Sequence, residues 1–226
     1  MTAAGKWLVL VPTALERSKL EFTSREDVAV ELCGFGPIVS AARTSQLISQ
    51  VRPDRIMLVG IAGSCRPDVE TGRAFQFRSV IGHGVGIGEG EHHISPTAAG
   101  WSLLDGHQGL ELEINLTVDE QGGDSIRNQI RTVCSVPANE VEAKALSTMY
   151  PNADAEDMES FGVAVAGQLA GIPLTVVRGI SNRVGNRDHS SWQVEQALAA
   201  ANELATQILG VIDLSLIHIS EPTRPY

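Results

Sequence analysis

Short apolar runs separated by helix-like stretches dominate the pattern of hydrophobic and polar positions along this chain. Most runs are bounded by Gly, Pro, Asn or Asp, and such bounded runs are typical of buried strands. The runs that predict strands are Trp7–Val11, Val28–Cys33, Arg55–Val59, Phe75–Ile81, Leu110–Leu116, Ile130–Cys134 and Leu174–Arg178.

Helix-like segments lie between these runs or follow the last one, and they predict helices at Pro37–Val51, Glu140–Met149, Met158–Ala170 and Trp192–Leu209. Strands that alternate with helices predict an α/β fold. We expect a single-domain three-layer sandwich, in which a central mixed, twisted sheet is flanked by helices on both faces. Ligands of such sheets bind at the carboxyl ends of the strands, so candidate chemistry is sought there.

The two ends of the chain differ from the rest. The apolar run Trp7–Val11 is too short for a signal peptide or a membrane helix, so no membrane partner is predicted. Residues 214–226 have the sequence LSLIHISEPTRPY and resemble a translated sequencing adapter. We therefore expect the domain to comprise residues 1–213 and residues 214–226 to be a non-native tail, the alternative being a natural disordered C-terminus.

Composition narrows the class of protein. The 226 residues include 17 Lys and Arg against 27 Asp and Glu, a net charge of −10 that argues against a nucleic-acid partner. Hydrophobic residues make up 43% and charged residues 19%, which is globular rather than disordered composition. The three cysteines are widely spaced and form neither a disulfide framework nor a zinc motif. A reducing, cytoplasmic location is expected.

Two glycine-rich segments follow predicted strands. Gly34-Phe35-Gly36-Pro37 joins a strand to a helix, and Gly60-Ile61-Ala62-Gly63-Ser64 follows the third strand. Both could bring backbone N–H groups close to a ligand, which makes Gly63 and Ser64 candidate binding residues. A tight turn or a plain strand exit would have the same composition, and the dinucleotide-binding fingerprint is absent.

Polar segments supply further candidates. Asp157-Met158-Glu159 opens a predicted helix, although the helix dipole alone favours a carboxylate there. Residues 180–188, ISNRVGNRD, leave the last predicted strand, where an α/β enzyme keeps its chemistry, although a hydrogen-bonded loop is the alternative. Residues 82–90 are glycine-rich and precede His92-His93. They predict a flexible flap or a solvated loop, and adjacent histidines cannot easily share one metal, so no metal site is predicted.

In this order and spacing the segments resemble the nucleoside phosphorylase and nucleosidase superfamily. The resemblance extends from the first strand to the last helix. It implies an enzyme that hydrolyses an N-glycosidic bond of a small-molecule nucleoside, without a metal or organic cofactor and as a homo-oligomer. It further implies that Glu159 binds the ribose hydroxyls, that Met158 packs on the sugar and that Glu16 activates water.

The base-binding position of the family falls on Ser181-Asn182. Adenosine-cleaving relatives have Ser-Asp there. Hypoxanthine presents two acceptors, O6 and N7, on that edge, and an Asn amide can donate to it without a proton of its own. The resemblance also places Val136-Pro137 beside the base. Asn182 therefore favours a 6-oxopurine as the leaving group.

Residues 11–16, VPTALE, and 180–188, followed by Trp192, are most similar to one branch of the superfamily, whose substrate is a hypoxanthine nucleoside bearing a benzoate. Arg183 and Arg187 are candidates for that carboxylate, because Arg pairs with carboxylates bidentately. Solvent-facing charge is the alternative role for at least one of them.

Three other functions stay open. A 6-oxopurine nucleoside phosphorylase would need a basic phosphate pocket, for which Arg43 and Arg66 are the available arginines. A methylthioadenosine nucleosidase is disfavoured by Asn182, and relatives of that kind place the water-activating acid about two residues later, where this chain has Ser18. A non-catalytic nucleoside-binding protein is disfavoured by the presence of Glu159.

Overall fold

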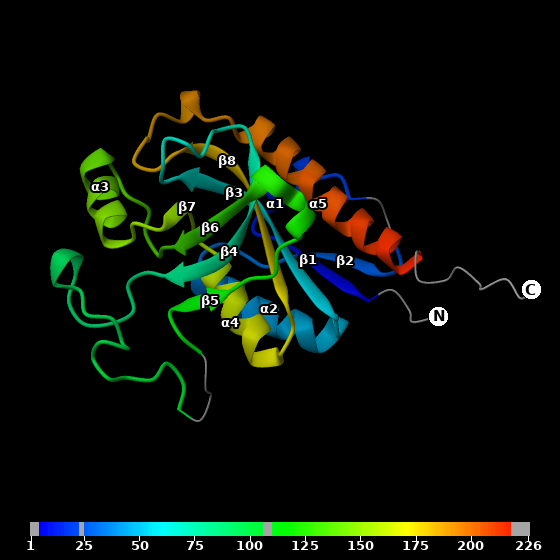
Figure 1. Ribbon diagram of the computed structural model, residues 1–226, viewed down its shortest axis with the longest axis horizontal. Coiled ribbons are helices and arrows are strands. Elements are labelled where there is room, and N and C mark those ends of the chain that lie inside the picture. The colour runs from blue at the N-terminus through cyan, green and yellow to red at the C-terminus, as the bar shows by residue number, and fades with distance from the viewer. Residues whose placement is uncertain (1–4, 23–24, 106–109, 218–226) are drawn as a thin grey trace, which may run out of the picture.

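A computed structural model of the chain describes residues 5–22, 25–105 and 110–217. It confirms the predicted α/β fold, with a central mixed sheet and helices on both faces (Figure 1). The strands are β1 Trp7–Val11, β2 Val28–Leu32, β3 Arg55–Ser64, β4 Ala74–Gly82, β5 Glu113–Asn115, β6 Ile126–Thr132, β7 Ala153–Asp157 and β8 Leu174–Arg183. The helices are α1 Ala14–Lys19, α2 Pro37–Val51, α3 Glu140–Met149, α4 Ser160–Ala170 and α5 Val194–Ile217.

The sheet has the strand order β2-β1-β3-β7-β6-β4-β5, and β8 pairs with both β3 and β4. Strands β3, β8, β4, β6 and β7 therefore pair in a closed ring. Most pairs are parallel, whereas β3–β7, β4–β5 and β4–β8 are antiparallel. Through these pairs the carboxyl ends of β3, β7 and β8 come together: Gly63 pairs with Glu156 on β7 and with Asn182 on β8.

The two faces of the sheet carry different helices. Helix α5 covers one face, and α2 and α4 pack side by side on the other (Figure 1). Successive side chains of β1 point to opposite faces of the sheet. Val9 belongs to the hydrophobic cluster under α5, and Leu8 belongs to the cluster under α2 and α4. Helix α5 approaches the sheet closely at Gly179, where a Cβ would collide with the Ala197 carbonyl. Helix α5 thus packs directly on β8.

Two strands are longer than the sequence predicts. Strand β3 continues through Gly60–Ser64, and β8 continues through Ser181 and Asn182 to Arg183. Glycines are poor strand formers, and the prediction therefore ended both strands too early. Pairing between the two strands along this stretch outweighs that local preference. The candidate residues consequently sit on strands rather than on turns.

Two elements were not predicted at all. Strand β7 has the sequence ADAED, which lacks the branched and aromatic residues of typical strands, yet all five residues are buried. Helix α1 has only six residues and begins with a capping box between Thr13 and Glu16. Both elements carry residues of the candidate site. Their sequences therefore give only a weak secondary-structure signal, because the candidate site uses side chains that are not typical of strands or long helices.

Other boundaries shift by a few residues. Strand β6 ends at Thr132 rather than Cys134, β5 covers only Glu113–Asn115, and α4 begins at Ser160. Helix α5 continues past Asp213 to Ile217, so its backbone extends into the predicted tail, whereas residues 218–226 lie outside the described residues. Among the described helices, none has the length and apolar character needed to span a membrane.

Candidate active site

A cavity of about 410 Å³ opens at the carboxyl ends of β3, β7 and β8. Most of the residues predicted for the site line it: Glu16, Gly63, Val136, Met158, Glu159, Ser181, Asn182 and Arg187. These residues come from separate segments of the chain, which the closed ring of strands brings to one place. Pro137, which was expected beside the base together with Val136, is not among the lining residues.

Ser64 and Arg183 do not enter this cavity. They directly follow Gly63 and Asn182 on β3 and β8. Both line a second cavity of about 750 Å³, whose lining also includes Arg187. The Ser64 hydroxyl donates to the Arg66 carbonyl at 2.6 Å, and the Arg183 side chain is exposed. The structure therefore places these two predicted residues outside the first cavity.

Glu159 is the N-cap residue of α4 and is buried. Its Oε1 accepts a hydrogen bond from the Gly36 backbone N–H at 3.1 Å, and its Oε2 accepts one from Arg178 Nη2 at 3.1 Å. Burial raises the pKa of Glu159 to about 7; Arg178 opposes the rise and the nearby Asp157 charge adds to it. The Gly34-Phe35-Gly36 turn thus contributes an N–H that positions this carboxylate.

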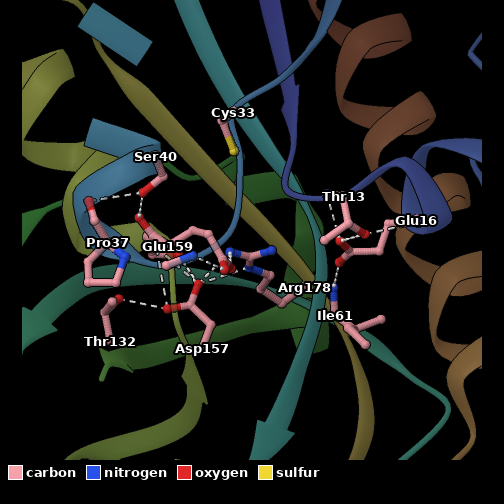
Figure 2. A network of polar contacts seen from close by, with 12 residues as sticks. Thr13, Glu16, Cys33, Pro37, Ser40, Ile61, Thr132, Asp157, Glu159 and Arg178 are labelled. Atoms are coloured by element: carbon pink, nitrogen blue, oxygen red, sulfur yellow. Dashed lines mark hydrogen bonds and ion pairs between the residues drawn. The ribbon is translucent and has the colours of Figure 1, made fainter. Parts of the chain in front are cut away.

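Arg178 is the central residue that the sequence did not reveal as part of the site. It is fully buried on β8, and its Nε and Nη2 donate to Asp157 Oδ2 at 3.0 and 2.5 Å. Asp157 also accepts from the Thr132 hydroxyl at 2.6 Å (Figure 2). This network joins β6, β7, β8 and α4. The available signal was one charged residue inside the apolar strand sequence LTVVRGIS.

Glu16 lies on the other side of Arg178 from Asp157 and Glu159 (Figure 2). Its Oε2 accepts from the Thr13 N–H at 3.1 Å and hydroxyl at 2.7 Å, and its Oε1 accepts from the Ile61 N–H at 3.1 Å. A Cβ at Gly60 would collide with Arg178 Nη1 and lie 2.6 Å from Glu16 Oε1. Glycine at this position lets both side chains approach β3.

One donor of this cluster has no partner. Arg178 Nη1 is buried and makes no hydrogen bond with the described part of the chain. Because both Nη1 and Glu16 Oε1 approach the same point above Gly60, a polar molecule between them could bond to both. A buried donor without a partner is costly, and such a position is suited to a bound ligand or water.

The base-binding candidate Asn182 is oriented by its neighbours. Its Oδ1 accepts from the Ser181 hydroxyl at 2.7 Å, and its Nδ2 donates to the Arg183 carbonyl at 2.9 Å. An amide NH₂ carries two hydrogens, so one of these donors remains for a ligand. Gly63 lies beside it on β3 and adds no side chain. Asn182 can therefore present an N–H to a group inside the cavity.

Aromatic and apolar side chains form the outer part of the cavity. The Arg187 guanidinium lies over the Trp192 ring, with 5.2 Å between Cζ and the ring centroid, and both residues line the cavity. Phe35 and Leu15 also line it, although 61% and 65% of their surface is exposed. The glycine-rich segment 82–90 contributes nothing to this lining.

The predicted absence of a metal site concerned His92 and His93. Among the described residues, no group of three or more His, Cys, Asp and Glu side chains could hold a metal ion. The His93 ring bonds instead to the Val85 carbonyl at 3.2 Å. The polar side chains that line the cavity include carboxylates, an amide and a guanidinium.

Comparison with known families places this site in a class. The model of the Phosphorylase superfamily matches residues 14–216, and the chain belongs to that superfamily. Among curated proteins, the chain is 26% identical over 185 residues to futalosine hydrolase of Streptomyces coelicolor, covering 80% of this chain and 77% of that protein. It is 24% identical over 188 residues to 5'-methylthioadenosine/S-adenosylhomocysteine nucleosidase of a Marinomonas strain, covering 78% and 77%.

A solved structure agrees on the fold. The 5'-methylthioadenosine/S-adenosylhomocysteine nucleosidase of Helicobacter pylori, crystallised with butyl-thio-DADMe-Immucillin-A, has a TM-score of 0.74 over 92% of this chain and 99% of that chain, at 15% identity. The family match and the curated relatives confirm the prediction of an enzyme of the nucleosidase kind. They do not separate the two substrate types that the relatives represent.

Proposed function

We propose that the chain is a futalosine hydrolase. It would hydrolyse the N-glycosidic bond of futalosine and release hypoxanthine and dehypoxanthinyl futalosine, a step of the alternative menaquinone route. The observation that carries this proposal is Asn182, an amide oriented by Ser181 in the cavity that also holds Glu159 and Glu16. The similarity to the Streptomyces coelicolor futalosine hydrolase supports it.

The ribose would bind at Glu159. A buried, ionised carboxylate accepts hydrogen bonds from the 2′ and 3′ hydroxyls, and these bonds strengthen as positive charge develops on the sugar. Arg178 and the Gly36 N–H leave lone pairs on both Glu159 oxygens for this purpose. Met158, which lines the cavity next to Glu159, would pack against the sugar.

The attacking water would be held between Glu16 and Arg178. Glu16 Oε1 accepts the water proton, and the unpartnered Arg178 Nη1 donates to the water oxygen. Thr13 and the Ile61 N–H fix the Glu16 carboxylate, so its geometry is set before substrate binds. General-base catalysis of this kind contributes roughly 10²–10⁴-fold.

The leaving base would be stabilised by Asn182. Its free N–H donates toward N7 and O6 of hypoxanthine as negative charge moves onto the base during C–N cleavage. An ionised Asp at this position would place an acceptor against O6. The proposed reaction needs neither a metal nor an organic cofactor.

The benzoate of futalosine would lie in the outer part of the cavity. Of the two arginines considered, Arg187 lines the cavity and Arg183 does not, so Arg187 is the proposed partner. Trp192 beneath the Arg187 guanidinium offers an aromatic surface for the ring.

Two alternative functions have weaker support. The two arginines considered for the phosphate pocket of a phosphorylase do not line the cavity: Arg43 lies 3.6 Å from Glu31, and Arg66 bonds to Asp68 at 3.1 Å. A methylthioadenosine nucleosidase has support from the Marinomonas relative. A base that presents an N7 acceptor and a 6-amino donor would gain less from Asn182.

We also propose that the enzyme works as a homo-oligomer. Leu15 and Phe35 border the cavity and are largely exposed, and Ile38 at the start of α2 is 80% exposed. A second copy of the chain over this side would cover these apolar side chains and narrow the cavity entrance.

The proposed activity is tested by chromatography of the free base released from futalosine, inosine and methylthioadenosine, each with and without phosphate. Hypoxanthine from futalosine, independent of phosphate, is the expected result. Release from inosine that requires phosphate would instead establish the phosphorylase. Release of adenine from methylthioadenosine alone would establish the other nucleosidase. Ligand binding without turnover of any substrate would refute an enzyme.

A further inference from the structure

Three residues form a row across the carboxyl ends of three strands. Gly63 on β3 pairs with Asn182 on β8 and with Glu156 on β7, so the three residues point to the same face of the sheet, and all line the cavity. Neighbouring strands lie about 4.8 Å apart, which puts the Asn182 and Glu156 backbones about 10 Å from each other. The glycine between them leaves the space above the row open.

Glu156 is a second cavity carboxylate, to which the sequence assigned no role. It is 4% exposed, and its Oε2 accepts from both Nε and Nη2 of Arg131, at 3.0 and 2.5 Å. Arg131 is itself fully buried on β6. Within the described residues no group donates to Glu156 Oε1. Arg131 therefore fixes the carboxylate and leaves one of its oxygens available to a ligand in the cavity.

The ion pair with Arg131 favours the ionised form of Glu156, which accepts hydrogen bonds. Burial raises the pKa of Glu156, whereas the charge and hydrogen bonds of Arg131 hold it down. The nearby charge of Asp157 adds to the rise. Among the described residues, the hydrogen bonds of the Glu156 carboxylate go to Arg131, whereas Asp157 and Glu159 bond to Arg178.

We propose that Glu156 accepts the N1–H of the 6-oxopurine base, with Arg131 as its positioning residue; this rests on the proposed function. The edge of hypoxanthine runs from the N1–H donor through the O6 acceptor to the N7 acceptor. Its complement is an acceptor at one end and a donor at the other, which Glu156 and Asn182 supply from opposite ends of the row. Adenine has an acceptor at N1, which would face the carboxylate unfavourably.

The test compares two free bases, hypoxanthine and 1-methylhypoxanthine, which lacks the N1–H. Their dissociation constants are measured by calorimetry on the full-length wild type, on Glu156→Gln and on Asp154→Asn. Asp154 is a matched control because it is a buried acid two residues earlier on β7, where it accepts from the Asn128 N–H and does not line the cavity.

The expected results follow from the donors of Arg131. In Glu156→Gln the amide oxygen keeps its bonds to the Arg131 guanidinium, because a guanidinium has only donors. The amide NH₂ then faces the base, and two donors, the NH₂ and the N1–H of hypoxanthine, oppose each other. We expect hypoxanthine to bind at least about 10-fold more weakly to Glu156→Gln, whereas binding of 1-methylhypoxanthine changes less than about threefold. Asp154→Asn should leave both constants within about threefold.

A folded Glu156→Gln that binds hypoxanthine within threefold of wild type would overturn the inference, as would an equal loss for both bases. If that variant does not fold, the wild type alone decides. A preference of at least about 10-fold for hypoxanthine over its 1-methyl derivative is expected, and equal binding overturns the inference. The proposed function is tested separately: it fails if the wild type releases no hypoxanthine from futalosine.

Discussion

At the scale of single residues, the site depends on charges that are buried next to their partners. Glu159 and Asp157 share one guanidinium, that of Arg178, whose Nη1 remains unpartnered. A charge in a protein interior is tolerated only with such compensation. Burial nevertheless raises the pKa of Glu159 to about 7, because Arg178 opposes the rise only in part.

Glu159→Gln should lower kcat/KM for futalosine at least tenfold, equal to about 1.4 kcal/mol of transition-state stabilisation. An amide binds the ribose hydroxyls but cannot balance positive charge on the sugar. Steady-state kinetics with hypoxanthine detection measures the effect, and circular dichroism controls for folding. Activity close to that of the wild type would remove Glu159 from the ribose position.

The pKa of Glu159, about 7, predicts how activity depends on pH. A raised pKa keeps the carboxyl protonated to higher pH, and the ionised form binds the hydroxyls, so kcat/KM should rise as pH increases through about 7. Asp157→Asn removes a neighbouring negative charge, lowers the pKa of Glu159 and moves this rise to lower pH.

The pH–rate profiles of wild type and Asp157→Asn measure that shift. Asp154→Asn, at a buried acid of β7 that does not line the cavity, is the control and should leave the profile unchanged. A rise at the same or a higher pH in Asp157→Asn would show that Glu159 does not control it.

Asn182→Asp should shift the preference from hypoxanthine nucleosides toward adenine nucleosides. A protonated Asp can donate to N7, while an ionised one opposes O6. The ratio of kcat/KM for futalosine to that for methylthioadenosine measures the change, which we expect to be at least about 10-fold. An unchanged ratio would place the base elsewhere.

Some of these residues could be found from the sequence and others could not. Glu159 and Asn182 lie in motifs whose order along the chain resembles the superfamily. Arg178, Arg131 and Glu156 gain their roles only from partners on other strands, and no local pattern records such pairing. The same limit explains why Ser64 and Arg183 were wrongly expected in the first cavity. Where a residue near a strand end points can be judged only once the bounds and pairing of that strand are known.

At the scale of elements, the bounds of two helices could be predicted better than strand boundaries. Helices α2 and α3 begin and end as predicted, since Pro37 and the Asn139 cap mark their starts. The strands that carry the site end in glycines and polar residues or, as β7, consist of Ala and acidic residues. Function there requires residues that local strand preference disfavours.

Gly162→Ala tests the packing of α4 against α2. A Cβ at this position would collide with the Pro37 carbonyl and lie 2.6 Å from Ser40 Oγ. The resulting strain should cost about 1–3 kcal/mol, enough to lower Tm by at least about 2 °C.

Gly167→Ala in the same helix is the matched control. Its Cβ would lie 3.2 Å from the Ile172 carbonyl, and the higher helix propensity of alanine offsets that contact. Calorimetric Tm values should therefore fall for Gly162→Ala only. A Gly162→Ala variant as stable as the wild type would show that the helices can move apart freely.

At the scale of the whole molecule, the closed ring of strands joins the parts of the site. It brings β3 and β8 against β7, although β7 lies about 90 residues after the end of β3. The sequence predicted the α/β class correctly, and most of the residues that it proposed for the site line one cavity at the strand ends. Ring closure through two antiparallel pairs left no signal in the chain, because β-pairing partners are not specified locally.

Ile38→Glu tests the proposed oligomer. A charge on this exposed apolar position should shift the particle mass, measured by light scattering after gel filtration, toward the monomer and should lower kcat/KM at least about threefold. Gln50→Glu, an exposed change at the far end of α2, should alter neither. A wild type that is already monomeric and fully active would contradict the proposal.

The central claim is that the cavity selects a hypoxanthine nucleoside. Equimolar futalosine and methylthioadenosine in one phosphate-free reaction give the ratio of the two kcat/KM values directly, as the initial ratio of hypoxanthine to adenine. Because a site with unpaired buried groups rejects the wrong base strongly, the ratio should exceed about 10². A ratio below one would make the enzyme an adenine nucleosidase and contradict the role of Asn182.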